Sequence, residues 1–442
     1  MEIKKYETNY KRNMYFHESN VKPKAFSLKL ENQVINIYPQ IKYQKIIGFG
    51  GAITEASGYS YNLLPNSKKE ELLNDYFSSD GLGYSIGRLP IGSSDFSKKS
   101  YSYSYKPDLS DFSIDKDKEY IIPFIKDALN KNENIKFLAS PWSPPKFMKS
   151  NKMLVLGGKL LDKYKQTYAD YISKYISSYK QEKININFIT VQNEPNAMQM
   201  WESCLYSEKD EAEFAYKYLY PTFQKNNIDT KILVWDHNKE KLFSRAVSEI
   251  LTNEASNAIS GFAFHWYTGD HFENIELVRE SFPEKLLIHT EGCTGYSKFN
   301  PNDEVKNAEM YAHDILGDLN SGVNAYIDWN LILDNNGGPN HKLNFCNSPI
   351  MLNPDSTDYI KNLSYYYIGH FSKFIKPESK RIAYSKYTDR IEVTSFINTD
   401  NSIAIVLLNR NGFNKEYNLC INDIVIHDNL DSHAIVTYLI KP

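Results

Sequence analysis

Residues 186–194 read INFITVQNE, an apolar stretch that ends in an asparagine and a glutamate. Its apolar part is short and rich in isoleucine, phenylalanine and valine, which predicts a buried β-strand rather than a helix. Strands buried on both faces are typical of parallel sheets, and such folds place their chemistry just beyond the carboxyl ends of the strands. This stretch therefore predicts a fold class and also where a site would lie.

Seven other stretches share this pattern of a short apolar run bounded by turn residues. The eight predicted strands span residues 46–52, 84–90, 135–142, 186–194, 231–237, 261–267, 286–291 and 325–330. Apolar residues at helical spacing lie between them, and helices are expected at 67–77, 161–179, 208–220 and 305–320. Ser67 is expected to cap the first of these helices.

Strands and helices that alternate eight times over about 330 residues predict an α/β fold, specifically a (β/α)8 TIM barrel. A doubly wound open sheet is the alternative. The glycines at 48–51 do not support its dinucleotide-binding form, because a GxGxxG fingerprint requires glycine where Ile53 stands.

The two ends of the chain carry a different pattern. Apolar and polar residues alternate from Phe26 to Ile37, which predicts a hairpin that turns at Glu31-Asn32. Beyond Pro377, short strands are expected at 391–397, 402–408, 416–421 and 435–440. Frequent turns of this kind are typical of an antiparallel β-sandwich. We therefore expect residues 46–376 to form the barrel, and residues 1–45 and 377–442 to form one β-sandwich side domain.

Composition excludes several classes of protein. The 442 residues include 51 basic and 54 acidic side chains, a net charge of −3, so nucleic acid is not an expected partner. No run reaches the roughly 18 apolar residues of a membrane-spanning helix. The first 20 residues lack the apolar core of a signal peptide, which predicts a cytoplasmic location as written, or secretion if a signal was trimmed.

Cysteine and histidine spacing gives no reason to expect a metal or another cofactor. The four cysteines, Cys204, Cys293, Cys346 and Cys420, are far apart in sequence and are expected to be reduced thiols. The 10 histidines are scattered, without an HExxH motif. Cys293 is expected to be a packing residue and His237 a structural one.

The predicted strand ends are rich in carboxylates and tryptophans, which suit an uncharged substrate with many hydroxyl groups. Carboxylates accept hydrogen bonds from hydroxyls, and indole faces stack on sugar rings. The residues at these positions are Asp95, Trp142, Asn193, Glu194, Asp236, His237, His265, Trp266, Tyr267, Glu291, Asp328, Trp329 and Asn330.

Two of these carboxylates end strands on opposite sides of the predicted barrel mouth. Glu194 and Glu291 would face each other there, and retaining glycosidases need two carboxyl groups about 5 Å apart. Partial burial can separate their pKa values so that one stays protonated near neutral pH. The alternative is that each glutamate caps a helix or pairs with an arginine, and periodicity alone leaves both interpretations open.

The chain resembles glycoside hydrolase family 30, most closely its glucosylceramidase-like branch, which contains lysosomal acid β-glucosidase. The resemblance extends from about residue 40 to the C-terminus, in order and without large gaps. The segments that carry it are GFGGAITE (48–55), GYSIGRLPIGSSDF (83–96), LASPWSP (138–144), TVQNEPN (190–196), HWY (265–267), TEGC (290–293), DWN (328–330), GGPN (337–340) and GHFSKFI (369–375).

The resemblance implies roles for particular residues and agrees with the fold predicted above. Glu194 would be the general acid/base and Glu291 the nucleophile of a retaining mechanism. Substrate contacts would come from Asn193 at the sugar 2-hydroxyl, from Asp95, Trp142 and Trp329 around the glucose ring, from His265 and Tyr267 supporting the nucleophile, and from Asn344 in the last barrel loop.

The function implied is that of a β-glucosidase of the glucosylceramidase type, acting on a β-glucoside or a related glycoside or glycolipid. Two departures from the branch, His341 after GGPN and Phe147 after SPP, would border the aglycone side and make ceramide doubtful as the leaving group. The alternatives are an endo-β-1,6-glucanase, a β-xylosidase or a β-fucosidase on the same scaffold. The alternative outside enzymes is a catalytically silent barrel that binds glycans.

Overall fold

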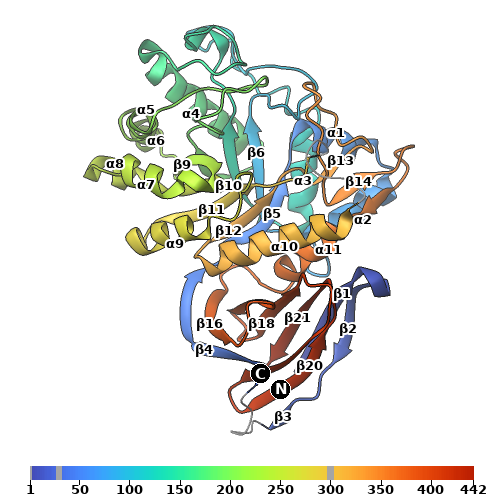
Figure 1. The fold of residues 1–442 in the computed structure, drawn as a ribbon. Coiled ribbons are helices and arrows are strands. Elements are labelled where there is room, and N and C mark those ends of the chain that lie inside the picture. Colours follow the sequence, from blue (N-terminus) through green and yellow to red (C-terminus); the bar gives the residue numbers. More distant parts are fainter. Residues whose placement is uncertain (1, 26–31, 296–302) are drawn as a thin grey trace.

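The computed structural model describes residues 2–25, 32–295 and 303–442, which form a closed barrel joined to a separate β-sandwich (Figure 1). The eight barrel strands are all parallel to their neighbours, in the order β10-β11-β12-β5-β6-β7-β8-β9, and this confirms the predicted TIM barrel. Their bounds are β5 Gly48–Ala52, β6 Ile86–Ile91, β7 Lys136–Pro141, β8 Ile186–Thr190, β9 Lys231–Asn238, β10 Ile259–His265, β11 Leu286–Glu291 and β12 Ala325–Asp328.

Helices surround this barrel on the outside (Figure 1). They are α1 Glu55–Leu63, α2 Asn66–Phe77, α3 Ile121–Lys131, α4 Lys165–Gln181, α5 Glu208–Glu213, α6 Tyr220–Lys225, α7 Leu242–Glu249, α8 Asn253–Ala258, α9 Phe272–Ser281, α10 Glu304–Asn320 and α11 Leu363–Ser372. The shorter helical turns are η1 Tyr10–Arg12, η2 Lys146–Met148, η3 Asp162–Tyr164 and η5 Lys239–Lys241, and a π-helical turn, η4 Phe214–Leu219, joins α5 to α6.

Two of the predicted helices differ in detail. Helix α2 begins at Asn66 after Pro65, and Ser67 lies within its first turn, so the prediction that Ser67 caps the helix is wrong. Proline is favourable at a helix start because its φ is already helical and its missing N–H has no intrahelical partner there. The helix predicted over 208–220 is divided into α5, η4 and α6.

Tyrosines of α4 form part of the packing outside the barrel. Tyr168, Tyr171, Tyr175 and Tyr179 recur every three or four residues and are buried. Their rings contact Tyr103, Phe112 and Phe214, and Tyr179 donates a hydrogen bond to buried Asp117, at 2.7 Å. These tyrosines therefore pack α4 against its neighbours rather than form a binding surface.

The sandwich is built from one ten-stranded sheet, in the order β2-β1-β21-β18-β17-β16-β4-β19-β20-β3. Its strands are β1 Glu2–Asn9, β2 Met14–Asn20, β3 Lys24–Ala25, β4 Val34–Lys45, β16 Lys380–Lys386, β17 Glu392–Ile397, β18 Ile403–Asn409, β19 Lys415–Ile421, β20 Ile424–Leu430 and β21 Ala434–Lys441. Both chain ends contribute, and β1 pairs with β21 along eight residue pairs. The sheet is antiparallel except between β4 and β19, which are parallel.

Sequence patterns found only part of this sheet. The predicted hairpin turn at Glu31 falls partly outside the described residues, and β4 pairs with β16 and β19. Strands β1, β2, β3, β16 and β20 were not predicted. Most residues of β2 and β3 are exposed, and β1, β16 and β20 carry many polar residues, so none of them shows a clear apolar pattern. A further three-stranded sheet follows β12 and comprises β13 Ile332–Leu333, β14 Ile350–Leu352 and β15 Tyr359–Lys361.

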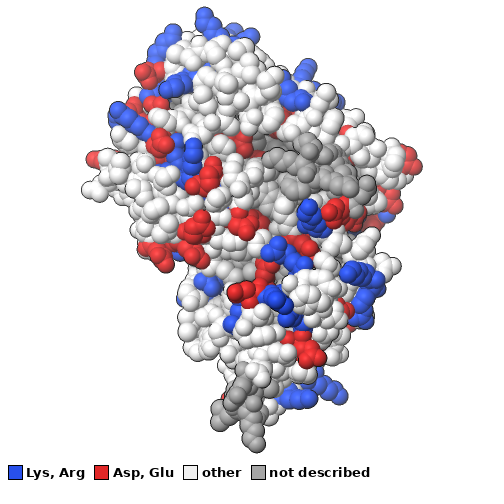
Figure 2. Space-filling model, viewed as in Figure 1, with Lys and Arg blue, Asp and Glu red and all other residues white. Residues whose placement is uncertain are grey.

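The sandwich is attached to the barrel by polar contacts as well as by packing. His370 of α11 is fully buried and lies within hydrogen-bond distance of Thr8 of β1, at 2.9 Å, and Thr437 of β21, at 2.8 Å. On the face shown in Figure 2, described basic and acidic side chains are interspersed. Within the described ranges, none of the helices is long and apolar enough to cross a membrane.

Close packing of the barrel strands predicts a strong effect at Gly50. A Cβ atom added at Gly50 would lie 1.5 Å from the backbone oxygen of Ile86, so Gly50→Ala must separate β5 from β6. We expect a loss of more than about 3 kcal/mol in the free energy of unfolding, measured by urea titration. Gly412→Ala, where the nearest atom is 4.0 Å away, is the control and should change stability by less than about 0.5 kcal/mol. Equal stability of the two variants would contradict the packing described.

Candidate active site

A hollow of about 630 Å³ lies beyond the carboxyl ends of the barrel strands. Most of the residues predicted from the sequence line it together: Asp95, Trp142, Asn193, Glu194, Tyr267, Glu291, Trp329 and Asn344. His265 is fully buried directly behind Glu194. The barrel thus brings together residues that are up to 249 positions apart in the chain.

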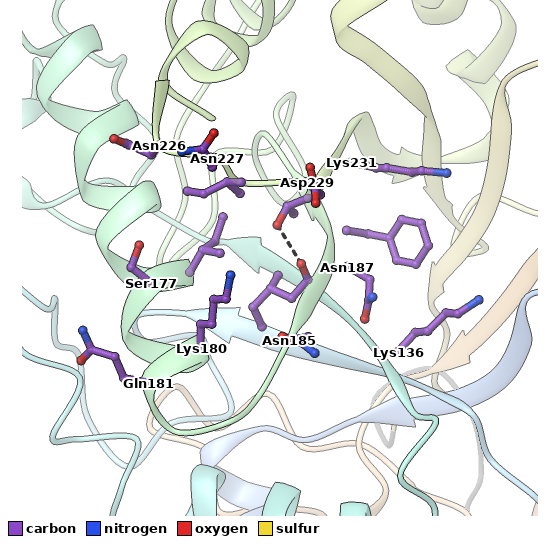
Figure 3. A pocket seen from close by; sticks show the side chains of 15 residues that line it. Lys136, Ser177, Lys180, Gln181, Asn185, Asn187, Asn226, Asn227, Asp229 and Lys231 are labelled. Carbon is purple, nitrogen blue, oxygen red and sulfur yellow. Dashed lines mark hydrogen bonds between the residues drawn. The ribbon is translucent and has the colours of Figure 1, made fainter. Parts of the chain in front are cut away.

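A second hollow of about 650 Å³ lies near the amino-terminal ends of β8 and β9 (Figure 3). Its polar lining is mostly amides and the lysines Lys136, Lys180 and Lys231. Figure 3 shows the amines of Lys136 and Lys231 directed to one side, away from Lys180, so the three charges do not converge. Chemistry in TIM barrels occurs at the carboxyl ends of the strands. The first hollow, which Glu194 and Glu291 line, is therefore the candidate active site.

The two glutamates are close together. Glu291 is the last residue of β11, and Glu194 follows β8 in a loop where its φ is +49°. One carboxylate oxygen of Glu194, one carboxylate oxygen of Glu291 and one ring nitrogen of His265 all lie within 4.8 Å of one another. Backbone strain at a non-glycine residue is common at functional sites, where the surrounding structure holds the side chain in place.

Arg88 organises the base of this site, although sequence reasoning did not select it. Arg88 is fully buried in β6 and donates to Glu291 Oε2 at 2.6 Å, to Asn193 Oδ1 at 2.8 Å and to Asp236 Oδ2 at 2.8 Å. Burial opposes its charge, but the carboxylates of Asp236 and Glu291 raise the pKa of Arg88. The sequence does contain a feature that could have identified Arg88: a charged residue inside an otherwise apolar predicted strand is unusual and needs a buried partner.

Asp236 is the second residue of this buried network that sequence reasoning did not assign to the site. It lies in a bulge of β9, where Trp235 and Asp236 both have positive φ and the register with β10 shifts. Its carboxylate accepts from Thr190 Oγ1 at 2.6 Å and from Thr290 Oγ1 at 2.6 Å. Although burial opposes ionisation, Arg88, His265 and Thr190 hold the pKa of Asp236 far below its ordinary value.

His265 lies between Asp236 and Glu194, with ring nitrogens 3.1 Å and 3.4 Å from their carboxylate oxygens. Burial lowers the pKa of His265, but the carboxylates of Glu291, Asp236 and Glu194 outweigh it and raise the pKa to about 9. Its contacts are with Glu194 and Asp236 rather than with the nucleophile candidate. Tyr267 does contact Glu291, donating to Oε1 at 2.8 Å.

The prediction that one glutamate stays protonated by burial is not met at Glu194. Burial raises the pKa of Glu194, but the hydrogen bond from His265 and the nearby ring of His237 lower it to about 2. His237, expected to be structural, lies 4.0 Å from the Glu194 carboxylate and lines the hollow. In the free protein, the Glu194–His265 pair therefore holds its proton on the histidine.

The opposite wall of the hollow has the groups that a sugar ring requires. Trp142 and Trp329 stack with ring centroids 5.4 Å apart and an interplanar angle of 23°. Asn344 donates to Asp95 Oδ2 at 3.1 Å. Burial and the nearby charge of Glu291 raise the pKa of Asp95 to about 7. Aromatic faces beside hydrogen-bonding groups are suited to a ring that carries hydroxyls.

Phe147 and His341, expected to border the aglycone side, are not among the residues that line the hollow. Phe147 packs edge-on against Tyr164, and the ring of His341 lies 3.5 Å from the Glu202 carboxylate. His341 is adjacent to the hollow, because its backbone N–H donates to the carbonyl oxygen of Asp95 at 3.3 Å, and the role of both positions beside an aglycone stays a prediction. Cys293 lines the hollow, with its sulfur 3.5 Å from Tyr267 Oη, and packs against the cluster that holds Trp142 and Trp329, as expected of a packing residue.

Both parts of the chain match models of one protein family. Residues 46–375 match the glycosyl hydrolase family 30 TIM-barrel domain, and residues 378–438 match the family 30 β-sandwich domain. The chain belongs to glycosyl hydrolase family 30. This confirms the resemblance found in the sequence and makes the protein a glycoside hydrolase.

Relatives of this family 30 protein include enzymes of two kinds. The lysosomal acid glucosylceramidase of Mus musculus is 32% identical over 399 residues, which cover 85% of this chain and 77% of that protein. The structure of SrfJ from Salmonella typhimurium matches with a TM-score of 0.97 at 34% identity, and the structure of an endo-β-1,6-glucanase matches with a TM-score of 0.91 at 29% identity. Both matches cover 100% of each chain.

The raised pKa of His265 predicts a pH-dependent contribution to the stability of this family 30 protein. Its folded pKa of about 9 exceeds the ordinary 6.5, so the stabilising contribution is complete below pH 6.5 and is lost as the pH rises through 9. We expect the free energy of unfolding of the wild type, relative to His265→Gln, to fall by about 3 kcal/mol over this interval. Urea unfolding at pH 6.5 to 9.5 measures it, and parallel curves for the two proteins would contradict it.

Proposed function

We propose that this chain is a retaining β-glycosidase that releases a β-linked glucose from a glucosylceramidase-type substrate. The observation that carries the proposal is the approach of Glu194 and Glu291 oxygens to within 4.8 Å. Retaining glycosidases hold their carboxyl groups about 5 to 5.5 Å apart, whereas inverting enzymes leave about 6.5 to 9.5 Å for a water molecule. The short separation supports direct attack by one carboxylate.

Glu291 is the nucleophile in this proposal. Arg88 and Tyr267 donate to different oxygens of its carboxylate, at 2.6 Å and 2.8 Å, and so fix its plane. In the first step, a Glu291 oxygen forms a bond to the anomeric carbon as the bond to the aglycone oxygen breaks. Positioning the attacking atom in this way removes much of the entropic part of the barrier.

Glu194 delivers the proton that the departing aglycone oxygen needs. The proton held on His265 lies across a 3.4 Å contact from Glu194, so the pair supplies one proton to the leaving group through the carboxyl. In the second step, Glu194 takes a proton from water, and the water oxygen displaces Glu291 from the anomeric carbon. Each displacement inverts the anomeric carbon, so after two steps the sugar carries its new hydroxyl in the original configuration.

Glucose would be recognised by the wall opposite this pair. Asp95, braced by Asn344, accepts hydrogen bonds from ring hydroxyls, and Trp142 and Trp329 cover the ring. Asn193 is held by Arg88, with the Asn193 Oδ1 accepting at 2.8 Å, which leaves its amide nitrogen for the 2-hydroxyl. This arrangement supports an exo-acting enzyme with one well-defined sugar subsite.

Exposed apolar residues that adjoin lining residues in the chain, here called the rim, favour an apolar aglycone. Met198 and Met200 are 67% and 68% exposed and are the chain neighbours of Gln199, which lines the hollow. Leu343, 75% exposed, is the chain neighbour of Asn344, which also lines it. Methionine side chains are flexible and adapt to varied apolar ligands. This rim supports a glycolipid or another apolar glucoside as substrate.

A second candidate function is endo-β-1,6-glucan hydrolysis. Beyond Tyr267, the hollow continues along the polar residues Thr268, Asp270 and His313. Polar groups there could contact a further glucose unit in place of a lipid. The similarity to a solved endo-β-1,6-glucanase supports this candidate as well.

The mechanism predicts different defects at the two glutamates. Glu291→Gln should lower turnover of aryl β-glucosides by more than about 10⁴-fold, because the nucleophile is lost. Glu194→Gln should lose much more activity on alkyl than on 2,4-dinitrophenyl glucoside, because a good leaving group needs little protonation. Proton NMR of the wild-type reaction should show the β-anomer of the sugar first. Initial release of the α-anomer would rule out retention, and equal losses on both leaving groups would rule out Glu194 as the acid.

The apolar rim predicts a selective effect on lipid substrates. Met198→Ser with Met200→Ser should raise KM for a long-chain alkyl β-glucoside about tenfold and leave KM for a methylumbelliferyl glucoside within about twofold. Leu251→Ser is the control, since Leu251 is 76% exposed between α7 and α8. Efficient cleavage of β-1,6-glucan, with no effect of the methionine changes, would favour the glucanase candidate instead.

A further inference from the structure

Glu291 is carried by a bulge in β11. In the register between β10 and β11, Phe264 is opposite His289 and His265 is opposite Glu291, so Thr290 is an extra residue. The Thr290 hydroxyl points into the barrel mouth, where it donates to Asp236. Bulges of this kind re-aim side chains next to active sites, and they need support because the strand ladder is interrupted.

His289 spans this bulge from the other side. Its ring is fully buried, and Nε2 lies 2.9 Å from the backbone carbonyl oxygen of Glu291. A carbonyl oxygen only accepts hydrogen bonds, so Nε2 must carry a hydrogen and donate it. The His289 side chain thus forms a hydrogen bond to the backbone of Glu291, two residues later in the chain.

The other ring nitrogen of His289, Nδ1, shares a proton with a carboxylate. His289 Nδ1 lies 2.6 Å from Asp318 Oδ2, a distance at which two bare acceptors would repel. Burial lowers the pKa of His289 to about 3 and raises the pKa of Asp318. One hydrogen therefore lies between His289 Nδ1 and Asp318 Oδ2, and the pair shares it.

Lys239 and Asp314 complete the cluster and balance its charge. The Lys239 ammonium lies 2.8 Å from Asp318 Oδ1, forms an ion pair with Asp314 and lies over the ring of Phe272. The Lys239 ammonium and the shared proton together balance the two carboxylates, so the buried cluster is neutral overall. His289, Asp314 and Asp318 have the geometry of a metal site, but the Lys239 nitrogen is the cation there.

We propose that Lys239, Asp314, Asp318 and His289 form a strut that fixes the β11 bulge, with His289 as a positioning residue for the nucleophile Glu291. Asp314 and Asp318 lie one turn apart on α10, so the strut connects an outer helix of the barrel to the reacting carboxylate. The role of Glu291 in this inference rests on the proposed function. The strut itself rests on the contacts that four buried side chains make.

Kinetics of three variants and one control variant test the strut. His289→Phe and Asp318→Leu should lower kcat on an aryl β-glucoside about 10²-fold with KM within about threefold, because the nucleophile shifts while the sugar wall is intact. Asp318→Asn is the matched variant and should stay within about threefold of the wild type, since its amide can donate to Nδ1 and accept from Lys239. His370→Phe, at a buried histidine far from the hollow, should lower thermal stability without lowering kcat.

Two kinetic outcomes would overturn the proposal. A folded His289→Phe protein with wild-type kcat would show that the bulge does not need the ring. An Asp318→Asn protein as impaired as Asp318→Leu would show that the cluster needs a carboxylate, which contradicts the shared-proton assignment.

A spectroscopic test does not depend on catalysis. In protein labelled with [15N]histidine, His289 should be neutral with its proton on Nε2, and its ring signals should not change between pH 5 and 8. Titration of His289 near pH 6.5 would overturn the strut, even if the wild type proves inactive on every glycoside. Inactivity of the wild type with the expected His289 signals would instead count against the proposed function alone.

Discussion

The site depends on one guanidinium group that is removed from water. Arg88 is fully buried and is paired with Glu291 and Asp236 at 2.6 Å and 2.8 Å. Removing one partner of a buried ion pair leaves an uncompensated charge and costs about 3 to 5 kcal/mol, so each carboxylate holds the other groups in place. The guanidinium also lies 4.8 Å from the Trp142 ring, which links the charged network to the aromatic wall of the hollow.

Around this group, the barrel uses two interrupted strands to direct polar side chains inward. Asp236 lies in a bulge of β9, and Thr290 is the extra residue of β11; the Thr290 hydroxyl donates to the Asp236 carboxylate at 2.6 Å. His265 adds a positive charge between Asp236 and Glu194. Contacts between side chains of different strands thus decide which groups of the site are protonated, and burial of a single glutamate does not.

The eight barrel strands were predictable because a strand buried on both faces is a short apolar run, and this pattern is visible in one dimension. Glu194 and Glu291 were found for the same reason, since they follow such runs. Arg88 was missed because a charged residue within an apolar run has no periodic signal. The polar strands β2 and β20 were missed because a partly exposed strand resembles a loop in composition.

The relative pKa values of the groups in the site also could not be predicted from the sequence. Burial alone predicted a protonated glutamate, but His265 and His237, from other strands, lower the pKa of Glu194 to about 2. Phe147 and His341 were placed beside the aglycone through the family resemblance, and neither is among the residues that line the hollow. Distances between strands decide such questions, and a Coulomb interaction changes steeply with those distances.

By itself, the sequence determined the barrel, the sandwich strands of the C-terminal part and the family, and it singled out the two glutamates as candidates, because these follow from local hydrophobic patterns and from motifs of adjacent residues. Only the tertiary structure decided that Arg88, Asp236 and His265 join those glutamates in one charged network. It also decided that His289 supports the bulge below Glu291. Each of these contacts joins side chains from different strands or helices, and their strength comes from shared burial that no single segment of the chain specifies.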